Sequence, residues 1–176
     1  MDERIKKNGI TFGILSGLFS VLMTTIIYVV NTNWFTSWWA GVFGFTVSII
    51  IGIVLLSKTQ KEFKGDYSFK SAFTTFFICS LVSIFIAVIF NIILFNFIDP
   101  ELKITLKQNI MKMTVETMQK FGARSSDINE AIKKMKESDQ FSVIEQLKGS
   151  IYTIILYSII GLILAAFFKN KPAYKE

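Results

Sequence analysis

The sequence predicts an all-α, polytopic membrane protein with four transmembrane helices in a bundle and a helical extramembrane segment between helices three and four. Three observations predict this class. Charge-free runs are long enough to cross a bilayer, tryptophans cluster between two crossings, and small residues recur every four positions. The chain is 52% hydrophobic, which exceeds the share in an ordinary soluble domain. We expect residues 1–176 to form a single membrane domain.

The charge-free runs define the crossings. Asp, Glu, Lys and Arg are absent from residues 8–57, 71–98 and 149–168. A helix rises about 1.5 Å per residue, so about 20 apolar residues cross a hydrocarbon core of about 30 Å. The first run is more than twice that length and therefore holds two crossings. The predicted spans are 9–30, 36–56, 72–97 and 149–168.

A cluster of tryptophans separates the first two spans. Trp34, Trp38 and Trp39 lie beside Asn31 and Asn33. Tryptophan prefers the headgroup layer, so this stretch predicts a tight turn at a membrane face, and a soluble-core cluster is the weaker interpretation. The first span is too long for a signal peptide and lacks a small-residue cleavage site before Trp34.

Basic residues predict the orientation. Both chain ends and the 57–71 loop are dense in lysine and arginine, whereas residues 99–148 carry nine basic residues offset by eight acids. This density predicts that both termini are cytoplasmic and that 99–148 lies outside. Lysines that flank membrane helices also account for most of the net charge of +6, so no nucleic-acid partner is expected.

Small residues form a stripe on each predicted helix. Gly9, Gly13 and Gly17 match no phosphate-binding loop, but their spacing puts them on one helix face, where small residues allow close helix approach. We expect this packing within one chain and rank homo-oligomerisation through the Gly9 stripe below it. The alternative is that some stripes face lipid. The candidate packing residues are Gly9, Gly13, Gly17, Gly44, Ser48, Gly52, Ser83, Ala87, Gly161 and Ala165.

The polar residues exclude several function classes. No ionisable Asp, Glu, Lys or Arg lies within a span, which disfavours a pump or coupled carrier but leaves a passive pore open. Histidine is absent and Cys79 is the single cysteine, so we expect no metal site, no cofactor and no enzyme activity. Asn91, deep in span three, predicts a hydrogen bond between helices.

Residues 99–148 have a helical pattern. Asp99 and Pro100 suit a helix start, and apolar residues recur at 102, 106, 110, 113 and 121. A second helix is expected to start at Asp127, and a third stretch at Ser138 or Asp139. These faces can fold on each other, lie on the bilayer surface or bind a partner, and self-packing or lipid ranks first. The candidate partner surface is Met111, Met113, Met118 and Met135.

Two motifs carry a resemblance. GDYSFKSAF at 65–73 enters span three, and FIDP at 97–100 ends it. With a glycine-bearing first span and a lysine-rich tail, this pattern resembles the DUF4199 family, bacterial four-span membrane proteins classed as a domain of unknown function. The resemblance covers nearly the whole chain. It implies an inner-membrane location and supplies no functional residues.

Two functions remain open. The first is a structural or interaction protein of the bacterial inner membrane that presents 99–148 to a membrane or envelope protein. The second is an oligomeric channel or small-solute permease.

Overall fold

The computed structural model describes residues 2–170, and every regular element in that part of the chain is a helix, which confirms the all-α class. Two lysines used to predict the orientation, Lys171 and Lys175, lie outside the described residues. The elements are α1 (Glu3–Val30), the 3₁₀ helix η1 (Thr32–Thr36), α2 (Trp38–Glu62), α3 (Phe69–Ile93), the π-helical turn η2 (Leu94–Ile98), α4 (Leu102–Lys120), α5 (Ser125–Glu137) and α6 (Val143–Phe168).

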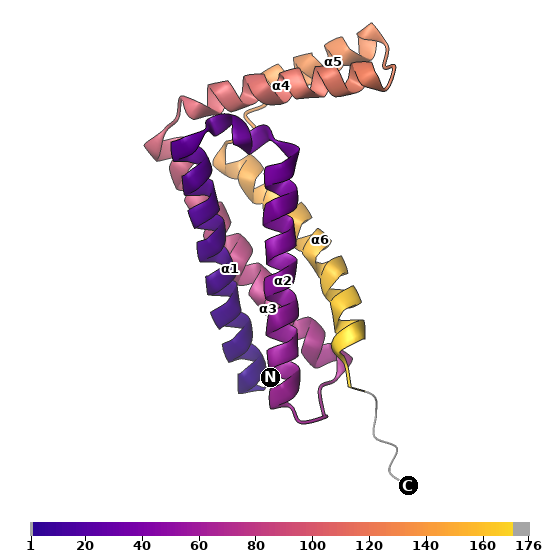
Figure 1. The fold of residues 1–176 in the computed structure, drawn as a ribbon. Helices are drawn as coiled ribbons and strands as arrows, with labels where there is room; N and C mark the ends of the chain where they lie inside the picture. Colours follow the sequence, from indigo (N-terminus) through magenta and orange to yellow (C-terminus); the bar gives the residue numbers. More distant parts are fainter. Residues whose placement is uncertain (1, 171–176) are drawn as a thin grey trace.

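Four long helices form a bundle, and two shorter helices lie across one end of it. Figure 1 shows α1, α2, α3 and α6 running lengthwise, with α4 and α5 as a hairpin at the top. We call this hairpin, residues 102–137, the arm, and the adjoining end of the bundle the arm end. The opposite end, which holds Glu3 and the α2–α3 loop, is the terminal end.

The outer surface of the bundle is apolar. The α1, α2 and α6 helices, and α3 together with η2, are each long and apolar enough to cross a membrane. Large apolar side chains point outward, for example Leu22 (57% exposed) and Ile151 (58% exposed). A soluble monomer rarely exposes an apolar surface of this extent, so the bundle is that of a membrane protein.

The helices extend past the predicted spans into the charged flanks, because these flanks contain capping residues. Asp2 accepts a hydrogen bond from the backbone N–H of Arg4 at 2.9 Å, which starts α1 six residues before the predicted span. At the end of α2, Lys61 lies in the last turn, where a positive charge favours the helix. Span boundaries follow hydropathy, whereas helix boundaries follow caps.

Packing centres on α3, which contacts α1 and α6 most extensively. At the terminal end, Phe76 of α3 packs in a buried cluster with residues of the α2–α3 loop and of α6. At the arm end, Leu94 and Phe95 pack with Leu102 and Leu106 of α4. Each end of the bundle therefore has its own core.

The glycines of α1 allow the closest helix contact. A Cβ atom on Gly9 would lie 2.9 Å from Ile78, and one on Gly13 would lie 2.7 Å from Val82. On Gly17 it would lie 2.8 Å from Ile86. These distances are shorter than van der Waals contact, so α1 and α3 approach this closely only because these positions lack side chains.

Phe76 occupies a second close contact. A Cβ on Gly52 of α2 would clash with the Phe76 ring, and one on Gly161 of α6 would come within 2.8 Å of the same ring. Ala165 of α6 is fully buried in the same cluster. The aromatic ring of one α3 residue thus fills the space that glycines leave on two neighbouring helices.

Gly44 does not belong to this packing. A Cβ at Gly44 would meet no atom within 4 Å, and the same holds for Gly41. Both glycines instead border a cavity between α2 and the other helices. Ser48, one turn further along α2, makes a hydrogen bond of 2.7 Å with Tyr157 of α6.

Asp99 supplies the predicted capping bond at the base of the arm, although α4 itself begins at Leu102, and two later helix starts differ from the prediction. Asp99 Oδ1 accepts a hydrogen bond from the backbone N–H of Leu102 at 3.0 Å. The α5 helix begins at Ser125 and not at Asp127, whose carboxylate instead pairs with Arg124 at 3.1 Å and lies in the first turn, where negative charge is favourable.

The start of α6 also differs from the prediction. Ser142, and neither Ser138 nor Asp139, caps this helix by accepting a hydrogen bond from the N–H of Glu145 at 3.3 Å. Residues 142–145 read Ser-Val-Ile-Glu, the spacing of a capping box, so the sequence itself contains a signal for this helix start.

Candidate functional site: the arm junction and the bundle cavity

The methionines predicted as a partner surface do not share one exposed face. Met113 is 46% exposed, whereas Met111, Met118 and Met135 are partly buried. Positions 111 and 118 lie two turns apart on one face of α4, and α5 packs against α4. The contact between α4 and α5 therefore covers most of the predicted partner surface, and Met113 is the methionine of this set that remains exposed.

A different row of apolar residues on α4 is buried near the bundle and exposed to solvent near the tip of the arm. Leu102 and Leu106 are buried against the arm end of the bundle. The same helix face continues through Met113 to Phe121 at the tip of the arm, which is 87% exposed. One face of α4 thus serves as core at its base and as an accessible apolar surface beyond the bundle.

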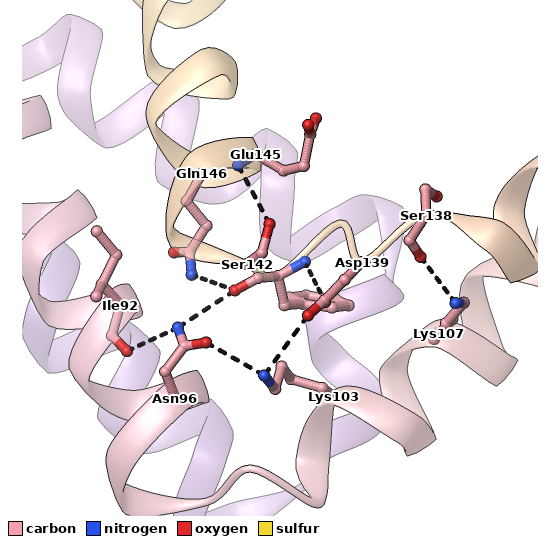
Figure 2. Close-up of polar contacts among 10 residues, drawn as sticks. Ile92, Asn96, Lys103, Lys107, Ser138, Asp139, Ser142, Glu145 and Gln146 are labelled. Atoms are coloured by element: carbon pink, nitrogen blue, oxygen red, sulfur yellow. Dashed lines mark hydrogen bonds and ion pairs between the residues drawn. The ribbon is translucent and has the colours of Figure 1, made fainter.

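Two lysines one turn apart tie α4 to the segment between α5 and α6 (Figure 2). The Lys107 ammonium donates to the backbone oxygens of Lys136, at 2.7 Å, and Ser138, at 2.8 Å. Lys103 Nζ lies 3.8 Å from an Asp139 carboxylate oxygen. The positive charge of Lys107 at the carbonyl end of α5 also stabilises that helix by interacting favourably with the helix dipole.

Asn96 joins three helices at the same place. Its side-chain oxygen accepts a hydrogen bond from Lys103 Nζ at 3.1 Å, and its amide nitrogen donates to the backbone oxygens of Ile92 and Phe141 at 3.0 and 3.3 Å. Gln146 of α6 donates to the same Phe141 oxygen at 2.7 Å. Figure 2 shows these groups converging between the end of α3, the base of α4 and the start of α6.

Two further bonds connect the base of α4 with the first helices. Tyr28 of α1 donates its hydroxyl hydrogen to Asp99 at 3.2 Å. Asn109 of α4 donates to the side-chain oxygen of Asn33 in η1 at 3.0 Å. We call this whole set the arm junction: Tyr28, Asn33, Asn96, Asp99, Lys103, Lys107, Asn109, Asp139 and Gln146.

The polar groups of the arm junction hold the arm in place. The carboxylates and ammonium groups of the junction contact one another or nearby uncharged groups, namely backbone carbonyls and N–H groups, the Asn96 amide and the Tyr28 hydroxyl. Within residues 2–170, no three metal-ligating side chains gather as a site. These groups are partly exposed to solvent, so each bond contributes less than a buried one, and together they connect the base of the arm to the bundle.

A cavity of about 420 Å³ lies inside the bundle, towards the arm end. Its walls come from α1, η1, α2, α3 and α6, and include Gly44, Ser48, Ser83 and Ala87 of the predicted packing residues. The cavity ends at Gly52 and Phe76. The Phe76 ring lines the cavity on one side and packs against Gly52 of α2, where the helices are again in close contact.

The cavity is partly enclosed by these helices and partly open to the outside of the bundle. The volume lies within the range of small-molecule sites. The cavity is therefore a second candidate site beside the arm.

Asn91 does not make the predicted bond between helices. Its side chain forms no hydrogen bond with any group in residues 2–170 and is only partly buried. It lines a smaller cavity of about 250 Å³ with Thr24 and Phe95, near the arm end. Its position there leaves its amide without the interhelical bond that we expected.

A polar cluster at the terminal end was not predicted. Asn8 is 5% exposed, and its amide donates to Thr59 Oγ1 at 3.2 Å and to a Glu62 carboxylate oxygen at 2.7 Å. The Arg4 guanidinium donates to the backbone oxygen of Glu62 at 2.8 Å and lies 3.9 Å above the Phe63 ring. Asn8 adjoins Gly9, so its position beside the glycine stripe was a usable signal.

Tyr67 in the α2–α3 loop is fully buried and donates a hydrogen bond to Thr75 at 2.9 Å. Burial raises the pKa of its phenol to about 12. The GDYSFKSAF motif thus contains a core residue of the terminal end in addition to the entrance of span three. Ser68 in the same motif caps α3 by accepting from the N–H of Ser71 at 3.1 Å.

A family model described as "Protein of unknown function (DUF4199)" matches residues 11–170. The chain belongs to this family. The resemblance read from its motifs is therefore confirmed. No curated protein and no solved structure matches the chain. The DUF4199 match includes the whole arm, the arm junction and the cavity, so all three lie within the part of the chain that carries the family's sequence pattern.

Proposed function

We propose that this DUF4199 protein is a non-enzymatic anchor of the bacterial inner membrane that holds the arm at one membrane face for another membrane or envelope protein. The proposed orientation, with both termini in the cytoplasm and the arm outside, is supported by the density of basic residues. The single observation that carries the proposal is the arm junction, in which Lys103 and Lys107 of α4 bind the α5–α6 connection.

The lysine bonds at the base of the arm support this function. Ordering long lysine side chains costs conformational entropy, and a loop that merely connects two membrane helices needs no such order. Here a hairpin of two helices extends sideways from the bundle with a fixed base. Beyond the base, Met113 and Phe121 give it an exposed apolar surface that a partner protein can bury.

Photocrosslinking in native membranes tests this function. A photoactivatable amino acid at Phe121 should give a discrete adduct with another protein, and Lys107→Met should weaken that adduct because the arm loses its direction. The same probe at Tyr152, a 75% exposed position on α6, serves as the control and should give lipid adducts. Absence of any protein adduct from Phe121, Met113 and Lys133 would reject the proposal.

The cavity favours a second function, passage of a small uncharged solute through an oligomer. Its lining contains no charged side chain, and its lower wall is closed by Phe76, which is 2% exposed. Passage would require this ring to move. Purified protein in liposomes should then transport a neutral solute, and Gly44→Phe should block that flux. Liposomes that pass no ion or solute at all would reject this function.

A further inference from the structure

The bundle cavity has an uncharged lining. Its wall residues are apolar or carry hydroxyl or thiol groups, and none is Asp, Glu, Lys or Arg. An ion or a charged headgroup buried there would lack a compensating charge, and the cost of that burial is large. The chemistry of the walls therefore selects an uncharged occupant.

Most hydroxyl groups of the walls bond to the protein itself, and those of Ser20 and Thr24 form no side-chain hydrogen bond within residues 2–170. Ser83 of α3 donates to Ser16 of α1 at 3.1 Å, and Ser48 bonds Tyr157 at 2.7 Å. Ser80 donates to the backbone oxygen of Phe76 at 3.0 Å. Since these groups have partners, the interior mainly presents alkyl and aromatic surface to an occupant. Water needs two to four polar partners to be held in a cavity.

The cavity is walled incompletely on one side. The α6 helix contributes only Thr153 and Tyr157, so its first part does not close the space. On the facing side, Gly41 and Gly44 of α2 have no atom within 4 Å of a Cβ position, and Phe45 is 42% exposed. The opening therefore lies between α2 and α6, on the arm side of the Ser48–Tyr157 bond, where the bundle faces lipid.

We propose that this cavity binds the hydrocarbon chain of a bilayer lipid, which enters sideways between α2 and α6. The walls run from Trp34 and Phe35 at the arm end down to Phe76 and Tyr157. Tryptophan lies at the headgroup level, so the cavity extends from that level inward, in the direction in which acyl chains of this leaflet run. The inference is independent of any partner of the arm.

Two glycines provide matched variants. Gly44 and Gly149 are both helical and both have open space at the Cβ position, but only Gly44 lines the cavity. Gly44→Phe fills the cavity without displacing a neighbour, and Gly149→Phe adds the same side chain on α6 outside it. Gly41→Leu, also in the cavity wall, is an independent second filling variant.

The measurement is electron spin resonance of a phosphatidylcholine labelled near the end of one acyl chain, with each protein in phosphatidylcholine vesicles. Wild type and Gly149→Phe should immobilise the same number of lipids, and Gly44→Phe and Gly41→Leu should each immobilise about one fewer per protein. Equal numbers in all four proteins would overturn the proposal.

A second measurement identifies a different occupant. A cysteine placed at Ser83, in a Cys79→Ala background, should react slowly with a water-soluble maleimide when a lipid chain fills the cavity. Reaction as fast as that of a cysteine at exposed Ser126 would mean a water-filled cavity and would overturn the proposal. Neither result depends on the photocrosslinks of the arm, so the two proposals fail separately.

Discussion

The ammonium group of Lys107 lies 2.7 Å from the backbone oxygen of Lys136, across the two helices of the arm. Because the same group also reaches the oxygen of Ser138, one side chain closes the carbonyl end of α5 and fixes it to α4. These hydrogen bonds hold α4 and α5 together, and the base of the arm is held in place by contacts with α3 and α6.

Lys107→Met should loosen the end of α5 while the bundle stays folded. The variant loses two charge-assisted hydrogen bonds that are partly exposed, so we expect a local cost of about 1–2 kcal/mol. Hydrogen exchange of the last α5 amides should accelerate about 5- to 30-fold. Lys112→Met on the exposed side of α4 is the control and should leave exchange unchanged.

Gly13→Ala should destabilise the bundle. The new methyl would lie 2.7 Å from Val82 and 2.8 Å from the Cys79 backbone oxygen, so α1 and α3 must separate. Overpacking of this kind costs about 1–3 kcal/mol, which outweighs the gain in helix propensity. Thermal unfolding in detergent measures the loss. Gly149→Ala, where the methyl meets no atom within 4 Å, should be neutral or stabilising, and equal losses in both variants would contradict the packing.

Tyr67 makes the stability of the terminal end sensitive to alkaline pH. Burial raises its pKa from 10.0 to about 12, so the unfolded chain loses this proton first as pH rises. The phenol's contribution to stability is complete below about pH 10 and is lost as the pH approaches about 12. Tyr67→Phe should lower thermal stability near neutral pH, through loss of the bond to Thr75, and should flatten its decline above pH 10. An identical decline in both proteins would contradict this assignment.

The sequence predicted the bundle well because hydrophobic length and small-residue spacing act locally. Residues 8–57 contain no charge, and Gly9, Gly13 and Gly17 recur at one spacing; both features are visible without a fold. The sequence does not show which neighbouring helix, if any, each row of small residues faces. Gly17 meets Ile86 of α3, whereas Gly44 borders a cavity, and only the placement of neighbouring helices distinguishes the two.

The arm junction could not be predicted for a related reason. Lys103 and Lys107 follow the ordinary pattern of a solvated helix face. Lys107 binds the backbone oxygens of Lys136 and Ser138, whereas Lys103 binds side-chain oxygens of Asn96 and Asp139. Backbone acceptors leave no mark in the sequence. The exposure of the four methionines could not be predicted, because periodicity reveals an apolar face without revealing which element covers it, and here that element is α5.

The fixed direction of the arm is the central claim, and a spin–spin distance measures it most directly. Labels at Lys133 of α5 and Trp38 of α2, both exposed, are introduced as cysteines in a Cys79→Ala background in lipid nanodiscs. We predict one narrow distance distribution that broadens when Lys103→Met and Lys107→Met are combined. A broad distribution in the otherwise unaltered protein, unchanged by these two substitutions, would contradict the claim.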